Sequence, residues 1–355
     1  MKIWRECFPD DSAMWRRMFF DAVYVDDEAL TLADPQTGAV VSSLLLLSYS
    51  MTFQGRSVGM GYIYGAGTLK KYRARGFMSR LLREALREAS ERGDTFVALV
   101  PATETLRRYY GRFGFATVFY SQLQRYTAIH RFNVEGRYRS LPADAPGLYE
   151  AFERMMSARP CCVQHSRAQF LTLMDDARIS GHPFAAVADE ATGKPCAMVW
   201  AVPEVASGVL RVSELLADSP DAARAVLTAL QHGLPMRPLT LMTRPDDAFV
   251  GGNLEAGGMA RVVNVESALR AVAENNPSTR LAVRLRDSIL PENSGVYILD
   301  GGLLTARYGP GAEAGVRLDL DITPEVLAAM LFSSAPIAEI TGLPAGRPHM
   351  SLMLD

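Results

Sequence analysis

The chain has 355 residues, of which 48% are hydrophobic and 21% are charged, as is ordinary for a soluble globular protein. This length leaves room for two or three domains. The net charge of -2 and the isoelectric point near 6.3 exclude a general electrostatic attraction to nucleic acids or membranes.

The cysteines, the histidines and the first residues bear on location and on metals. The cysteines show neither metal-ligand spacing nor a dense disulfide framework, and the five histidines are scattered, so we expect reduced thiols and no metal. Residues 1–11 lack the apolar run of a signal peptide, and the leucine-rich run at 43–48 is far too short to span a bilayer. We therefore expect a cytoplasmic protein without a membrane span. The cysteines are Cys7, Cys161, Cys162 and Cys196.

Residues 1–33 predict helical segments, and two strands should follow. Asp11 or Ser12 is a candidate helix cap, and apolar residues fall on one face of the helix after it: Trp15, Met18, Phe19 and Val23. Residues 40–51 and 56–66 have the composition of strands and are separated by a turn at 54–55.

A basic turn separates the second strand from an amphipathic helix. Residues 70–83 contain six basic side chains and no acidic one. The helix after the turn has apolar residues on one face, at Phe77, Leu81, Leu82, Ala85, Leu86 and Ala89. A strand that turns through Arg-x-x-Gly into a helix offers unpaired N–H groups and a positive helix end, and both favour a phosphate.

Two motifs in this region resemble those of the GNAT acetyltransferases. The run RARGFM, from Arg73 to Met78, resembles the family's pyrophosphate loop, Arg/Gln-x-x-Gly-x-Gly/Ala. A strand at 95–100 follows, and then a helix that ends in YYGRFGF at 109–115, which resembles the family's second signature. The motifs stand in the family's order and separation. Met78 departs from the small residue that is usual there, although bulky residues also occur in the Eis-like branch.

After His130 the order of helices and strands starts again. Helices are predicted at 144–157, at 166–175 and from Ser219 or Asp221 to Gly233, with strands at 184–188, 196–202, 209–216 and 239–243. This order is again acetyltransferase-like. Because it lacks an Arg-x-x-Gly loop and a tyrosine-rich second motif, we interpret it as a non-catalytic copy.

The last part of the chain resembles the small sterol-carrier-protein-like domain that ends the Eis-like acetyltransferases. Residues 257–263 are expected to be the junction to it. Period-2 stretches from Thr279 predict a hairpin, residues 316–321 alternate as in a strand, and Thr323 and Pro324 open a helix. A generic α+β module is the alternative for this segment.

The predicted fold class is therefore α+β, with tandem acyl-CoA N-acyltransferase (GNAT) folds followed by a sterol-carrier-protein-like α/β domain. The predicted boundaries are 1–128 for the catalytic domain, 129–265 for the degenerate copy and 266–355 for the carrier-protein-like domain. Eis-like proteins assemble, so the resemblance also implies a homo-oligomer.

The resemblance implies acetyl-CoA as a co-substrate, with no metal. It assigns the donor to the end of the second strand and to the basic loop, at Ala66, Gly67, Thr68, Arg73, Ala74, Arg75, Gly76, Met78 and Ser79.

The resemblance also implies catalytic groups. The tyrosine four residues before Gly114 is Tyr110, which would act as general acid, whereas Tyr109 is expected to be a packing residue. In Eis-like enzymes the terminal carboxylate reaches into the cleft, and here that residue is Asp355. A solvated terminus is the alternative. Asp26 and Asp27 lie in the first helical region, which borders the acceptor site in this fold, and are candidates for an acidic wall around a cationic acceptor.

The predicted function is acetyl-CoA-dependent N-acetylation of a primary amine on a small molecule or peptide by direct attack on the thioester. One alternative is a non-catalytic acyl-CoA- or lipid-binding regulatory protein on the same fold. A nucleic-acid patch along the basic stretch is a second alternative, against which the acidic isoelectric point and the absence of interleaved exposed aromatics count, so we expect no nucleic-acid partner. The acceptor amine stays open.

Overall fold

The computed structural model describes residues 2–244, 254–333, 343, 346 and 348–353. Contacts divide the chain into two compact units, each assembled from separate segments. The first consists of Met1–Asp11, Tyr24–Phe119 and Ala256–Pro348, and the second of Ser12–Val23, Tyr120–Glu255 and His349–Asp355. The three-domain division stays a prediction, and these units join stretches that it separates.

The first unit is built on a mixed sheet. β2 (Val40–Phe53) and β3 (Arg56–Thr68) form a long antiparallel pair, as predicted, and β3 runs parallel to β4 (Phe96–Leu99). β1 (Ala29–Ala33) pairs antiparallel with β2. The prediction that residues 1–33 are helical is therefore wrong for 29–33, because these residues find a strand partner about ten positions further along the chain.

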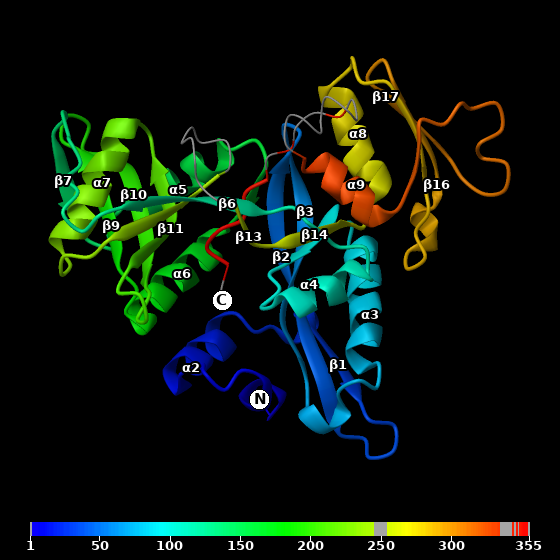
Figure 1. Ribbon diagram of the computed structural model, residues 1–355, viewed down its shortest axis with the longest axis horizontal. Coiled ribbons are helices and arrows are strands. Elements are labelled where there is room, and N and C mark those ends of the chain that lie inside the picture. Colours follow the sequence, from blue (N-terminus) through cyan, green and yellow to red (C-terminus); the bar gives the residue numbers. More distant parts are fainter. Residues whose placement is uncertain (1, 245–253, 334–342, 344–345, 347, 354–355) are drawn as a thin grey trace. The chain divides into compact units, whose positions relative to one another are not determined.

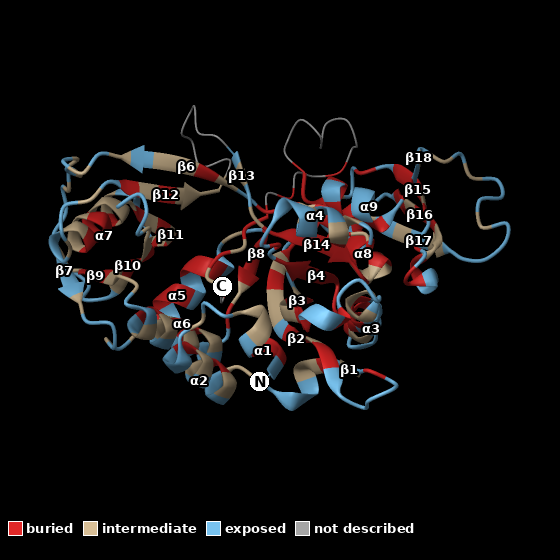
Figure 2. Ribbon diagram, turned by 60° about the horizontal axis from the view of Figure 1, so that its bottom comes forward, coloured by how far each residue is buried: buried red, intermediate tan, exposed pale blue. Residues whose placement is uncertain are grey.

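A strand from late in the chain completes this sheet. β14 (Met259–Val262) pairs antiparallel with β4 and with β5 (Ala116–Thr117), which gives the order β1-β2-β3-β4-β14-β5. Figure 1 labels β1, β2, β3 and β14 of this sheet. Residues 257–263 were expected to be a junction between domains, and within them residues 259–262 form a strand of this sheet. All residues of β4 and β14 are buried, as is typical of strands that are covered on both faces (Figure 2).

Helices of the first unit carry the two motifs. α3 (Phe77–Glu91) buries Leu81, Leu82, Ala85, Leu86 and Ala89 and exposes most of its charged residues, as its periodicity predicted. α4 (Glu104–Gly111) begins at Thr103, whose hydroxyl accepts the N–H of Leu106 at 3.2 Å. The remaining short helices are α1 (Lys2–Cys7), η1 (Asp26–Glu28) and η2 (Lys70–Tyr72).

The end of the first unit forms a second sheet with the order β17-β16-β15-β18. The predicted hairpin and the helix after Thr323 are present, but the alternating residues 316–321 contribute only from Leu320 onward. At Asp319 the carboxylate accepts the N–H of Ala282 at 2.8 Å. The elements are α8 (Val265–Asn275), β15 (Leu281–Leu285), η3 (Pro291–Asn293), β16 (Gly295–Asp300), β17 (Leu303–Arg307), β18 (Leu320–Ile322) and α9 (Pro324–Leu331).

The second unit has one sheet with helices on both faces. The strand order is β13-β6-β12-β11-β10-β9-β7. One apolar cluster joins α7 to the sheet, and another joins α5 and α6 to it. Its helices are α2 (Ala13–Ala22), α5 (Leu148–Ser157), α6 (Arg167–Ser180) and α7 (Pro220–His232). Its strands are β6 (Tyr120–Tyr126), β7 (Tyr138–Leu141), β8 (Cys162–Gln164), β9 (Phe184–Asp189), β10 (Pro195–Pro203), β11 (Leu210–Ala217), β12 (Leu239–Thr243) and β13 (Leu254–Ala256).

The two units share a strand–helix–strand arrangement but differ where the helix begins. β3, α3 and β4 in the first unit correspond to β11, α7 and β12 in the second, with the two strands parallel in each case. α3 starts at Gly76 without a side-chain cap. α7 starts at Ser219, whose hydroxyl accepts the N–H of Ala222 at 3.1 Å, and Pro220 follows. The start of α7 therefore offers fewer unpaired N–H groups to an anion.

Within the described ranges no helix has the length and apolar composition that crossing a membrane requires. None of the four cysteines, all of which lie in described segments, takes part in a disulfide.

Candidate active site

The two motifs of the first unit line one open cavity of about 590 Å³. All of the predicted donor-binding residues except Arg75 border it. Tyr109 and Tyr110 of α4 also contribute. The lining consists of Cys7, Phe8, Ala66, Gly67, Thr68, Tyr72, Arg73, Ala74, Gly76, Phe77, Met78, Ser79, Ala102, Leu106, Tyr109 and Tyr110.

The strand that leads into the cavity contains a bulge. Ser43 pairs with Gly67 but Leu45 pairs with Tyr64, so β3 holds one more residue than β2 across this interval. At the bulge Gly65 has φ of +58°, and a Cβ there would lie 2.4 Å from the ring of Trp4. Glycine is therefore required both by its backbone angle and by the close approach of α1. A bulge leaves backbone groups outside the ladder, where a ligand can reach them.

The basic loop turns sharply before α3. Ala74 has φ of +60° and Gly76 has φ of +81°, and the first turn of α3 contains no acidic residue. A left-handed alanine is uncommon and is held only by its surroundings. The Nε atom of Arg73 donates to the carbonyl of Thr68 at 3.0 Å, which ties the loop back to the strand. The start of α3 has no side-chain cap and borders the cavity, so its N–H groups suit an anion.

Two members of the predicted donor set have particular surroundings. Arg75 does not line the cavity, because its guanidinium rests over the ring of Tyr72, 5.3 Å from the ring centre. Met78 borders the cavity and also packs against the apolar core between α3 and the sheet. The bulky side chain at this position is thus accommodated by the core.

Tyr110 borders this cavity and is largely buried. It is only 7% exposed, and burial, with a smaller effect of Tyr109, raises its pKa to about 12. The hydroxyl is therefore protonated at neutral pH and available as a donor. The hydroxyls of Tyr109 and Ser79 lie 3.1 Å apart. Tyr109 therefore links α4 to α3, the two helices that carry the motifs.

The acidic residues predicted on the acceptor side do not contribute to the described lining of the cavity. Asp26 and Asp27 form an exposed turn of η1 and do not line the cavity. Asp355 lies outside the described residues.

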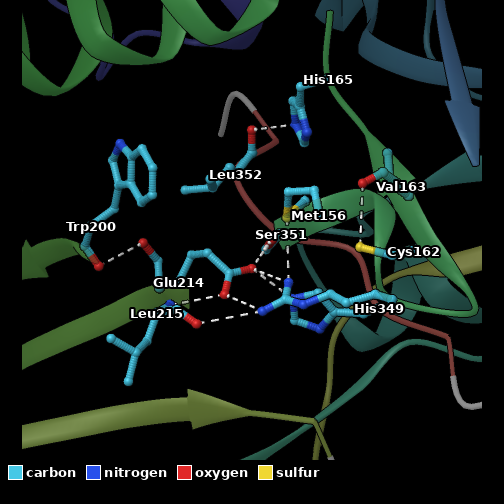
Figure 3. A network of polar contacts seen from close by, with 12 residues as sticks. Met156, Cys162, Val163, His165, Trp200, Glu214, Leu215, His349, Ser351 and Leu352 are labelled. Carbon is cyan, nitrogen blue, oxygen red and sulfur yellow. Dashed lines mark hydrogen bonds and ion pairs between the residues drawn. The ribbon is translucent and has the colours of Figure 1, made fainter. Parts of the chain in front are cut away.

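A buried polar network that the sequence analysis did not identify holds the described C-terminal residues within the second unit (Figure 3). One oxygen of Glu214 accepts from Arg159, His349 and Ser351, and the other accepts from Arg159 and from the N–H of Leu215. The ring of His165 lies 3.2 Å from the carbonyl of Leu352. This C-terminal polar network consists of Arg159, His165, Glu214, His349 and Ser351.

One member of the C-terminal polar network, Glu214, could have been found from the sequence. β11 buries every second residue, at Leu210, Val212, Glu214 and Leu216. A glutamate at a buried position of an alternating strand requires charged partners. The partners themselves are distant in sequence and were not predictable.

Comparison with known proteins agrees with the motifs. Residues 1–118 match the family model described as acetyltransferase (GNAT) domain, which covers both the basic loop and Tyr110. No curated protein matches the chain in sequence.

Solved structures extend the likeness over nearly the whole chain. A GCN5-related N-acetyltransferase from Kribbella flavida is 19% identical, with a TM-score of 0.72 over 98% of this chain and 95% of that one. One from Anabaena variabilis ATCC 29413 is 18% identical, with a TM-score of 0.74 and coverage of 97% and 90%. Eis1 from Mycobacterium abscessus is 17% identical, with a TM-score of 0.68 and coverage of 92% and 89%. At these identities the likeness shows a shared, mixed α/β GNAT-like fold.

Proposed function

We propose that the protein is an acetyl-CoA-dependent N-acetyltransferase that transfers an acetyl group to a primary amine. The observation that carries this proposal is the single cavity bordered by the bulged end of β3, the basic loop and Tyr110. The match of residues 1–118 to an acetyltransferase domain supports it.

The donor's pyrophosphate would lie at the start of α3. There the N–H groups have no side-chain cap, the first turn carries no carboxylate, and Arg73 adds a positive charge. We assign this role to Arg73, Ala74, Gly76, Met78 and Ser79 through their backbone, and to Arg75 as a nearby charge. Ala66, Gly67 and Thr68 would pair with the pantetheine arm, and an N–H of the bulge would face the thioester oxygen.

Tyr110 would serve as the general acid. The amine nitrogen attacks the thioester carbonyl directly, the C–N bond forms, the C–S bond breaks, and the proton of Tyr110 passes to the departing sulfur. Because burial raises the pKa of Tyr110 to about 12, the hydroxyl holds its proton until a thiolate forms beside it.

The proposed acceptor side consists of three acidic residues. Asp355 is proposed to contribute its carboxylates to proton removal from the amine, and Asp26 and Asp27 are proposed to attract a cationic acceptor. The start of α7, which is capped by Ser219 and carries Asp221 in its first turn, supports a second GNAT-like copy that binds no donor of its own.

The wider assignment follows the resemblance. We propose an Eis-like tandem type with a carrier-protein-like domain at 266–355, after copies at 1–128 and 129–265, and a homo-oligomer in the cytoplasm. The likeness in fold to Eis1 supports the tandem arrangement.

Calorimetric titration with acetyl-CoA tests the proposal. We expect a Kd in the roughly micromolar range for the natural protein and loss of binding in Gly76→Glu, which places an anion at the start of α3. Gly93→Glu is the matched control, since Gly93 follows α3, also has positive φ, and has open space around its Cβ position.

The outcomes separate the alternatives. Binding that survives Gly76→Glu would show that the loop is not part of the donor site. If the natural protein does not bind acetyl-CoA, the proposed acetyltransferase activity is refuted. Binding without thiol release in the presence of any tested amine would favour the non-catalytic acyl-CoA-binding alternative.

A further inference from the structure

A fully buried arginine stands in the strand that completes the first unit's sheet. Arg261 of β14 is 1% exposed, and its Nη2 atom lies 2.7 and 2.5 Å from the two carboxylate oxygens of Asp287. That carboxylate also accepts the N–H groups of Ile289 and Leu290, at 2.9 and 3.0 Å. A buried charge is tolerated only with such partners. The pair is therefore a fixed point within the first unit.

The other end of the guanidinium holds the turn after α4. Nη1 of Arg261 donates to the carbonyl of Phe113. The N–H of Phe113 in turn donates to the carbonyl of Tyr110 at 2.8 Å. Arg261 is thus two hydrogen bonds from the backbone of the proposed general acid.

The glycine of the second motif makes room for this contact. Gly114 has φ of +80°, and a Cβ there would lie 2.4 Å from Nη1 of Arg261. The motif therefore ends in glycine here for two reasons: the left-handed turn and the guanidinium that occupies the space beside it.

Side chains reinforce the same connection. Ile289 and Leu290, whose N–H groups bind Asp287, pack in the apolar core that contains Tyr110 and Phe113. α4 has only eight residues and depends on such tertiary contacts for its position.

We propose that Arg261 and Asp287 are positioning residues for Tyr110, which place its hydroxyl by holding the turn that ends α4. This inference rests on the proposed role of Tyr110 in acetyl transfer. Neither residue lines the cavity, so neither touches a substrate there. An error of about 1 Å in the position of a catalytic group can cost on the order of a hundredfold in rate.

The first test separates kcat from donor binding. Arg261→Lys keeps the charge but lacks the fork that reaches both partners. The double variant Arg261→Met, Asp287→Asn removes both charges, so neither is left buried alone. We expect kcat to fall about 10- to 100-fold in both, with the Kd for acetyl-CoA within about threefold of the natural value, because neither residue lines the cavity that would hold the donor. Arg280→Met, at the exposed pair with Asp300, is the control and should change neither quantity.

The second test asks whether the effect passes through Tyr110. In a Tyr110→Phe background the same Arg261 substitutions should have almost no further effect on kcat, since the hydroxyl they position is absent. Equal fold-losses in both backgrounds would overturn the proposal.

A third measurement does not depend on turnover. With 3-fluorotyrosine at position 110, the ¹⁹F resonance should shift or broaden in Arg261→Lys and stay unchanged in Arg280→Met. An unchanged resonance in Arg261→Lys would refute the positioning role. If the natural protein transferred no acetyl group, the proposed function would fail, while the resonance would still decide whether Arg261 places this ring.

Discussion

Glu214 accepts hydrogen bonds from Arg159, His349 and Ser351 in the network that holds the described C-terminal residues. We consider Glu214→Gln, which keeps the shape of the side chain but removes its charge. The two contacts from Arg159 and the one from His349 all measure 2.8 Å, and the Glu214 side chain is 3% exposed. The glutamine amide can replace only one of the two accepting oxygens, which leaves the guanidinium of Arg159 poorly paired in a buried site.

The expected cost follows from that geometry. Breaking one partner of a buried ion pair costs about 3–5 kcal/mol, whereas an exposed pair contributes about 0–1 kcal/mol. Glu150→Gln is therefore the matched control, because Glu150 pairs with Arg167 in the same unit at 3.0 Å with both side chains about 60% exposed.

Two assays report on the outcome. Urea denaturation can be followed by fluorescence, since Trp15 and Trp200 belong to the second unit. Hydrogen exchange should accelerate at the N–H groups of Val163 and His349, which join the C-terminal residues to β8 and the residue before it. A Glu214→Gln variant within about 1 kcal/mol of Glu150→Gln, with unchanged exchange, would refute the reasoning.

The same carboxylate predicts a dependence on pH. Burial alone would raise the pKa of Glu214, but the charges of Arg159 and His349 hold this pKa well below its ordinary value. Below about pH 4.5 the unfolded chain therefore binds more protons than the folded one, and stability falls as the pH falls. Above that pH the stabilisation by Glu214 is complete. Glu214→Gln should lose less stability than the natural protein between about pH 4.5 and pH 3.

Three further substitutions test the roles proposed for α4 and α7. Tyr110→Phe should lower kcat by about 10²–10⁴-fold with little change in the Kd for acetyl-CoA, whereas Tyr109→Phe, which loses only the contact with Ser79, should have a much smaller effect. Equal losses in the two variants would contradict the assignment of the general acid. Ser219→Ala should lower the free energy of unfolding by about 1 kcal/mol in urea denaturation without changing acetyl-CoA binding, because its hydroxyl caps α7. A loss of donor binding in that variant would contradict the non-catalytic interpretation of the second copy.

The parts of the structure that local chemistry determines were predictable from the sequence. The apolar stripe of α3 and the turn at Gly76 each depend on residues a few positions apart. Each pair of cap candidates, Asp11 or Ser12 and Ser219 or Asp221, included the residue that caps the helix. Every member of the predicted donor set borders the cavity except Arg75, whose side chain packs on Tyr72 three positions earlier. That stacking depends on the path of the loop, which the spacing of charges alone does not define.

The pairing of distant strands was not predictable in the same way. Residues 257–263 contain glycines and a short apolar run, which are also typical of a junction between domains. What makes them a strand is the space between β4 and β5, more than 140 positions earlier. β1 was missed for the same reason, since a five-residue segment acquires its structure from its partner.

The charge within β14 limits how that strand can be placed. Four buried residues in an apolar run would pack in more than one register. A shift of one residue would turn Arg261 to the opposite face of the sheet, away from both Asp287 and the carbonyl of Phe113. The buried ion pair therefore penalises the wrong register by several kcal/mol. Arg261 reaches Asp287 and the carbonyl of Phe113 in the observed register, so the cost of its burial is offset there. In the same register its contact with Phe113 holds the turn after Tyr110.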